Sequence, residues 1–83
     1  MYTASILHHL GVVKMLSRKI IKLRDYIQIT QQELGEILGV SKGQISHYET
    51  GKRIPSIACA AILMLLGEKY GIEFYMKDFL KEK

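Results

Sequence analysis

Three features of the sequence predict an all-α fold, a compact bundle of four to five helices. Through most of the chain, apolar residues recur at intervals of three and four, which is typical of helices that bury one face. Hydroxyl residues stand where these segments begin and glycines where they end, as expected of capped helices. Apolar residues make up 48% of the 83-residue chain and proline occurs once, so we expect one modest core with few interruptions.

The first three helices are expected to follow one another closely. The first covers about residues 13–27, and its buried stripe would consist of Leu16, Ile20, Leu23 and Ile27. The second should begin at Thr30, because "TQQE" is a capping box, and end at Gly39, where a left-handed residue is needed. Ser41 and a second box, "SKGQ", should open the third. Two helices joined so tightly must cross steeply, so the pair forms a helix-turn-helix.

The fourth helix is expected to be unusually apolar. The third should stop near Glu49, before Gly51, and the fourth should start at Pro55 and Ser56. The fourth helix, "IACAAILMLL", is apolar on every face, and a domain of this size cannot cover such a helix by itself. Part of its surface is therefore expected to meet a second copy of the chain.

The two ends of the chain carry weaker patterns. We divide the chain into an unassigned N-terminal extension (1–12), a helix-turn-helix domain (13–70) and a C-terminal tail (71–83) that serves as a dimer or packing element. A short final helix is predicted in the tail, although its apolar residues also alternate as in a strand. The alternating residues are Ile72, Phe74 and Met76.

Composition and charge favour a polyanionic partner. The net charge is +4, and residues 14–24 carry five cations and no acid, a run that by itself is typical of a solvated helix face. Cys59 is the only cysteine, which excludes an intramolecular disulfide. No apolar run is long enough to span a bilayer and the N-terminus lacks a signal-peptide pattern, so we expect a cytoplasmic protein without membrane contact.

The sequence contains no pattern typical of an enzyme or of a cofactor site. There is no phosphate-binding glycine loop, no obvious acid–base carboxylate pair and no Ser or Cys nucleophile signature. His8 and His9 would point to different helix faces, and no third metal ligand has suitable spacing. We therefore expect no catalysis, cofactor, metal or small-molecule ligand.

The third helix should have a core-facing side and an open side. Its inward residues are expected to be Val40, Ile45 and Tyr48. The helical period then sends four residues outward: Lys42, Gly43, Ser46 and His47. Such a helix fits the major groove of DNA, where an ammonium can donate to guanine, a hydroxyl can pair with several bases, and a neutral imidazole offers one donor and one acceptor. Gly43 leaves room for close backbone approach or for a thymine methyl group.

The run "LRDYIQITQQELGEILGVSKGQISHYETGKRIPS" resembles the lambda-repressor/Cro-like helix-turn-helix family, also called the XRE family, over about Ile20–Leu66. The resemblance implies that Lys42, Gly43, Ser46 and His47 read DNA bases. It implies phosphate contacts from Gln31, Gln44, Lys52 and Arg53. It also implies an ion pair between Arg24 and Glu49, which would join the first helix to the end of the third.

Three positions depart from the family pattern. Gln28 stands where a glycine is usual before the second helix, which opens the way to a different loop there. Gly35 replaces a more common alanine, so the position remains small. Tyr48 replaces a smaller aliphatic residue, and its hydroxyl therefore needs a partner or solvent.

The function implied by the resemblance is a sequence-specific regulator that binds double-stranded DNA. We expect a repressor that acts as a homodimer on a palindromic operator, of the kind found in phages, prophages and bacterial regulatory circuits. The dimer would form through the apolar surface of the fourth helix and the tail. The alternative is an antitoxin-type regulator, which would bind a toxin protein and control its own promoter.

Overall fold

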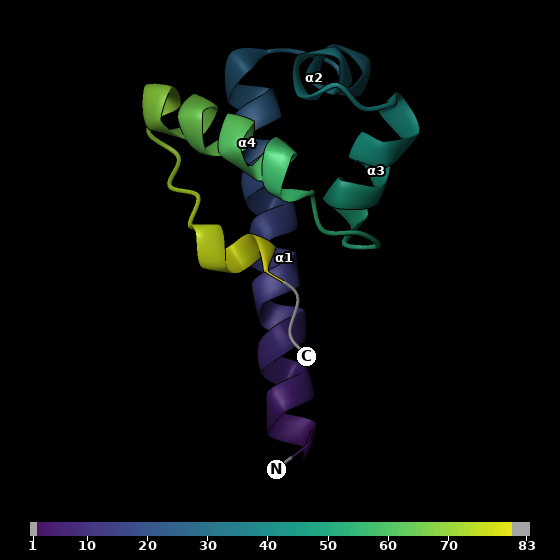
Figure 1. The fold of residues 1–83 in the computed structure, drawn as a ribbon, viewed down its shortest axis with the longest axis vertical. Helices are drawn as coiled ribbons and strands as arrows, with labels where there is room; N and C mark the ends of the chain where they lie inside the picture. The colour runs from purple at the N-terminus through teal and green to yellow at the C-terminus, as the bar shows by residue number, and fades with distance from the viewer. Residues whose placement is uncertain (1, 81–83) are drawn as a thin grey trace.

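A computed structural model describes the backbone of residues 2–80 and the side chains of residues 14–80. Four α-helices and one 3-10 turn make up the described chain, and none of its residues is assigned to a strand (Figure 1). The elements are α1 (Tyr2–Ile27), α2 (Gln31–Leu38), α3 (Lys42–Thr50), α4 (Ile57–Tyr70) and η1 (Met76–Phe79). The predicted all-α fold is confirmed. No helix of the described residues is long and apolar enough to cross a membrane.

Helix α1 is longer than the sequence pattern predicted. It runs from Tyr2 rather than from about residue 13, and Figure 1 shows its N-terminal half extending beyond the other helices. The stretch before residue 13 contains no proline and a single glycine, Gly11, which costs a helix only about 1 kcal/mol. A helix that is already nucleated by its buried stripe can therefore propagate through it. The histidine pair His8–His9 lies outside the described side chains.

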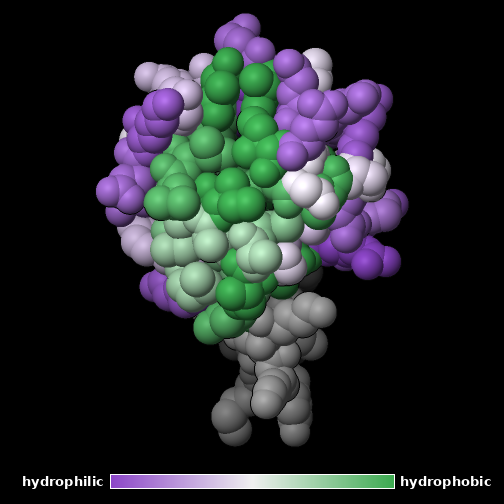
Figure 2. Space-filling view, turned by 45° about the horizontal axis from the view of Figure 1, so that its top comes forward, coloured by the Kyte–Doolittle hydropathy of each residue, from purple (hydrophilic) through white to green (hydrophobic). Residues whose placement is uncertain are grey.

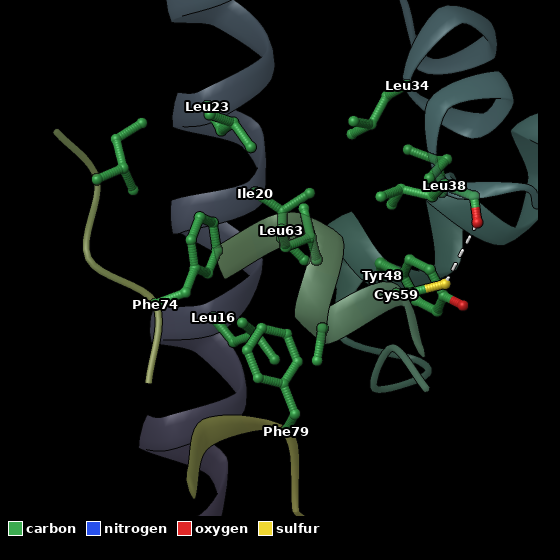
Figure 3. Close-up of a cluster of buried hydrophobic side chains, with 13 residues drawn as sticks. Leu16, Ile20, Leu23, Leu34, Leu38, Tyr48, Cys59, Leu63, Phe74 and Phe79 are labelled. Carbon is green, nitrogen blue, oxygen red and sulfur yellow. Dashed lines mark hydrogen bonds between the residues drawn. The ribbon is translucent and has the colours of Figure 1, made fainter. Parts of the chain in front are cut away.

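The core draws on every element of the fold. The largest fully buried side chains are those of Ile20, Leu23, Leu34, Ile45 and Leu63. Around them lie Leu16, Leu38, Tyr48, Cys59, Ala60, Ile72, Phe74 and Phe79 (Figure 3). Each fully buried leucine or isoleucine contributes about 1.5–3 kcal/mol relative to exposure. Because α1 supplies Leu16, Ile20 and Leu23, it forms the central support on which the helix-turn-helix rests.

The C-terminal tail packs as an extended segment followed by one turn. Ile72 and Phe74 are buried while Glu73 and Tyr75 are exposed, so the alternation seen in the sequence holds for these four residues. Met76, the third apolar residue of the predicted alternation, is exposed, and the described chain offers no partner strand. The predicted final helix is reduced to the 3-10 turn η1, which places Phe79 in the core. The tail fits over α4 because residue 67 is a glycine, since a Cβ there would lie 2.6 Å from the Phe74 ring.

Helix α4 begins where the sequence predicted. Ser56 is its N-cap, accepting a hydrogen bond from the Cys59 amide at 3.3 Å, and Gly71 ends it with a φ of 75°. One side of the helix enters the core. The other side leaves in solvent what we call the α4 stripe: Ile57, Ala58, Ala61 and Leu65. Figure 2 shows apolar residues gathered over this side of the molecule.

Candidate nucleic-acid interface

Helices α2 and α3 are joined by a turn that only small residues allow. Gly39 has a φ of 75° and donates its amide to the Gly35 carbonyl oxygen, as a helix C-cap requires. The Val40 amide bonds to the same oxygen at 2.8 Å. A Cβ on Gly35 would come within 2.6 Å of the Val40 carbonyl oxygen. The small residue at position 35 therefore makes room for the backbone of the turn rather than for the helix that follows.

The two predicted capping boxes differ in how completely they form. At α2 both halves are present, because the Thr30 hydroxyl accepts from the Glu33 amide at 3.1 Å and the Glu33 carboxylate accepts from the Thr30 amide at 2.9 Å. At α3 the Ser41 hydroxyl accepts from the Gln44 amide at 3.1 Å. Both residues are described by the structure, and the Gln44 side chain accepts no hydrogen bond from the Ser41 amide. The second box is thus a serine cap alone, which leaves the Gln44 amide group for other contacts.

Helix α3 turns one side into the core and keeps the other side polar. Ile45 is completely buried and Tyr48 is 4% exposed, while Val40 packs against the same core. On the far side Lys42 and Gly43 are exposed, and Ser46 and His47 are half-buried. Thr50 is exposed on this side as well, so we define the outer face of α3 by five residues: Lys42, Gly43, Ser46, His47 and Thr50.

Thr50 was missed by sequence reasoning because it was assigned to the helix break with Gly51. The helix in fact includes Thr50, whose hydroxyl donates to the Ser46 carbonyl oxygen at 3.0 Å. It follows Ser46 by four residues, so extending the helical period by one turn would have found it. Its hydroxyl proton is used within the helix, and the oxygen lone pairs remain available.

The Arg24–Glu49 ion pair ties α1 to the C-terminal end of α3. Arg24 donates from Nε to Glu49 Oε2 at 2.8 Å and from Nη2 to Oε1 at 3.2 Å. The Glu49 side chain is 7% exposed and that of Arg24 is 22% exposed, so the pair is largely withdrawn from water. The hydrogen bond with Glu49, opposed by burial, raises the pKa of Arg24 above its usual value.

Two further hydrogen bonds reinforce this junction. The Gln31 side-chain amide donates to Glu49 Oε1 at 3.0 Å, which commits one of its two N–H groups. Ser17, a buried polar side chain of α1, donates its hydroxyl to the Tyr48 carbonyl oxygen at 2.9 Å. Sequence reasoning overlooked Ser17, whose only signal was a polar residue beside the buried Leu16. Helix α3 is therefore held from α1 at two successive residues, Tyr48 and Glu49.

The loop after α3 places two cations beside its C-terminal end. Gly51 has a φ of 79°, and the amides of Lys52 and Arg53 bond to the His47 carbonyl oxygen at 2.9 and 3.3 Å. The loop thereby closes the helix and keeps the Lys52 and Arg53 side chains exposed. Gln44 is half-buried at the opposite end of α3.

Two departures from the family pattern have visible consequences. Gln28 has a φ of 66° and is the one non-glycine residue of the described chain with a positive φ, which explains why glycine suits this position. Its side chain donates to the Asp25 carbonyl oxygen at 2.8 Å. Tyr48 is accommodated beside Cys59, and burial, together with this thiol, raises the pKa of its hydroxyl above the usual value of a tyrosine.

Two steeply joined helices, the second with a polar outer face and cations beside it, define a DNA-binding helix-turn-helix domain. A family model described as helix-turn-helix matches residues 20–70, well over half of the chain. The protein therefore belongs to this helix-turn-helix family, and it is a DNA-binding transcription regulator of the XRE type rather than a member of an enzyme family. No curated protein and no solved structure matches the chain at a significant level.

Proposed function

We propose that this regulator is a repressor that binds a palindromic operator as a homodimer. The observation that carries the proposal is the fixed pose of α3, whose C-terminal end is tied to α1 while its outer face stays open. A helix held in this way can enter the major groove with its N-terminal residues over base edges. Repression would follow when the dimer covers a promoter and excludes polymerase.

Base reading is assigned to Lys42, Gly43, Ser46 and His47, with Thr50 at the end of the same face. Lys42 and Gly43 lie in the first turn of α3 and are exposed, as residues over base edges must be. Ser46 and His47 follow one turn later on the same side.

Phosphate contacts are assigned to Lys52 and Arg53, the exposed cations beside α3. Gln44 and Gln31 are assigned the same role at the starts of α3 and α2, where free backbone N–H groups attract anions. Gln31 would use its second N–H group, because Glu49 already accepts the first. It would then contact a phosphate and support the Arg24–Glu49 pair at the same time.

The dimer interface is assigned to the α4 stripe and the neighbouring tail, which a second copy of the chain would cover. Leu65 is 68% exposed and Ile57 is 55% exposed. Exposing two large apolar side chains on one helix is unfavourable for a small protein unless another surface covers them. Three residues of the stripe, Ile57, Ala61 and Leu65, recur every four residues along a single helix. A twofold axis can therefore pair the stripe with the same stripe of a second copy. Such a dimer would place its two α3 helices about 34 Å apart, the spacing of successive major grooves.

Selection of bound sites from random duplex DNA tests this proposal directly. We expect enrichment of two inverted half-sites with a fixed spacing close to one helical turn. Enrichment of a single half-site would remove the dimer from the proposal, and no enrichment at all would contradict sequence-specific binding.

One observation favours the alternative of an antitoxin-type regulator. A groove of about 760 Å³ lies between α4 and the tail, and its lining includes Glu68 and Glu73 but no cationic residue. A basic toxin could use such a groove, and it would compete with the second copy because Ala61 and Leu65 belong to both surfaces. Expression together with the neighbouring genes decides between them: a second protein retained at fixed stoichiometry favours the antitoxin, and a lone dimer favours the repressor.

A further inference from the structure

The two ring nitrogens of His47 are not equally open to a ligand. Nδ1 is buried and has no hydrogen-bond partner among the side chains and backbone that the structure describes. The residue as a whole is only half-buried, and Nε2 is neither enclosed in this way nor bonded within residues 14–80. The imidazole therefore meets solvent, or a ligand, through Nε2.

This asymmetry decides where a neutral imidazole carries its proton. A neutral histidine has one N–H and one lone pair, and either nitrogen can hold the proton. A proton on Nδ1 would bury an N–H group with no acceptor, and orphaned buried N–H groups are rarer in folded proteins than under-satisfied acceptors. A proton on Nε2 instead gives the N–H group to solvent and leaves only the lone pair enclosed.

We infer that His47 reads DNA solely as a hydrogen-bond donor, through Nε2–H, and that its target is an acceptor on the major-groove edge. The inference rests on the proposed function and sharpens it. The acceptors available there are N7 and O6 of guanine, N7 of adenine and O4 of thymine. The amino groups of adenine and cytosine are excluded, because the one lone pair that could accept from them is enclosed in the protein.

The neighbouring side chains make the outer face of α3 rich in donors. The Lys42 ammonium has three donors and no acceptor. Both long side chains of this face therefore seek acceptors, and guanine offers two of them on one edge. We expect the operator half-site to present a guanine or another acceptor beneath His47, and the same beneath Lys42. The sequence alone had left His47 free to donate or to accept.

The first experiment needs no DNA. Nitrogen-15 NMR of the full chain, at a pH where histidines are neutral, distinguishes protonated from unprotonated ring nitrogens. The signals of His47 are identified by their loss in His47→Gln, since His8 and His9 also contribute. We expect Nε2 to be protonated and Nδ1 unprotonated, and the opposite tautomer would overturn the inference.

The second experiment compares variants of equal shape. Glutamine and glutamate are isosteric, but glutamine can donate and ionised glutamate can only accept. The readout is the ratio of affinities for the selected operator and for an operator in which the base pair beneath residue 47 is exchanged. We expect a ratio of about tenfold or more for the wild type, about one for His47→Ala, a retained preference for His47→Gln and a reversed one for His47→Glu.

The outcomes separate the two proposals. Selection by the wild type of cytosine beneath His47, a base whose major-groove edge offers an amino group and no acceptor, would overturn the donor assignment while leaving sequence-specific binding intact. Failure to select any DNA would instead refute the proposed function, and the NMR measurement would still decide the tautomer.

Discussion

The outer face of α3 and the α4 stripe are both left uncovered by the core, yet they have opposite chemistry. The face of α3 is polar, its helix is held at Tyr48 and Glu49 by hydrogen bonds, and it offers few apolar atoms. The α4 stripe consists of apolar side chains without hydrogen-bonding groups. Recognition through directional hydrogen bonds requires that the donors and acceptors be held in fixed positions. Recognition through burial of apolar surface requires only sufficient contact area and a complementary shape. The same small core therefore supports two surfaces that should fail in different ways when mutated.

The largest expected effect is on the apolar side. Leu65→Glu should weaken the proposed dimer by about 3–6 kcal/mol, because each of two copies loses the burial of a leucine worth about 1.5–3 kcal/mol. Sedimentation over a range of protein concentrations measures the change. Met15→Glu is the matched control, since Met15 is 57% exposed but lies on α1 outside the stripe. A Leu65→Glu protein that remains as dimeric as the wild type would remove α4 from the interface.

A large effect on the polar side should appear in stability rather than in assembly. Glu49→Ala should lower the free energy of unfolding by about 3 kcal/mol, because Arg24 loses its partner in a largely enclosed site. Chemical denaturation gives the value, and Glu49→Gln should cost less because it keeps an acceptor. A loss below about 1 kcal/mol would mean that the pair behaves like an exposed ion pair.

On the outer face of α3 the expected effects of mutation depend on the DNA sequence. Lys42→Ala should reduce discrimination at one base-pair position by about 1–3 kcal/mol, because a donor to a base edge is lost. Binding titrations with operators changed at single positions would show this, and unfolding should be nearly unaffected since Lys42 is exposed. Unaltered discrimination at every position would place Lys42 outside the groove.

The cations beside α3 should show a different response to salt. Arg53→Ala should weaken binding to all sequences alike and reduce the slope of log affinity against log salt by about one, as expected for one lost phosphate contact. Lys69→Ala is the control, because Lys69 is exposed at the end of α4, away from α3. An unchanged slope for Arg53→Ala would exclude that phosphate contact.

The smallest expected effect concerns the loop that leads into the helix-turn-helix. Gln28→Gly should raise the free energy of unfolding by about 0.5 kcal/mol, because glycine adopts a φ of 66° without the strain of a side chain. The gain is limited by the lost hydrogen bond to Asp25. Gln28→Asn should fall between the two, since asparagine tolerates this region. A destabilised Gln28→Gly protein would show that the side-chain bond outweighs the strain.

Much of the fold followed from local patterns in the sequence. The caps at Thr30, Ser41 and Ser56 and the helix ends at Gly39 and Gly71 depend on groups a few residues apart, so the sequence shows them directly. The inward set Ile45 and Tyr48 follows from the helical period, and so does the open side of α3. Family resemblance supplied the Arg24–Glu49 pair, which joins residues that no local pattern connects.

Other features were decided only when distant segments packed together. Whether the tail forms a helix or an extended segment depended on the space above Gly67, and the uncovered side of α4 depended on where α1 and the tail lie. The enclosure of His47 Nδ1 depends likewise on its surroundings in the fold. Hydrogen bonds within a helix act over three or four residues, so the sequence alone determined helices α2, α3 and α4 and their polar and apolar sides. Burial is set by neighbours far away in the chain, so the tertiary structure alone decided which atoms of those sides remain open to a partner.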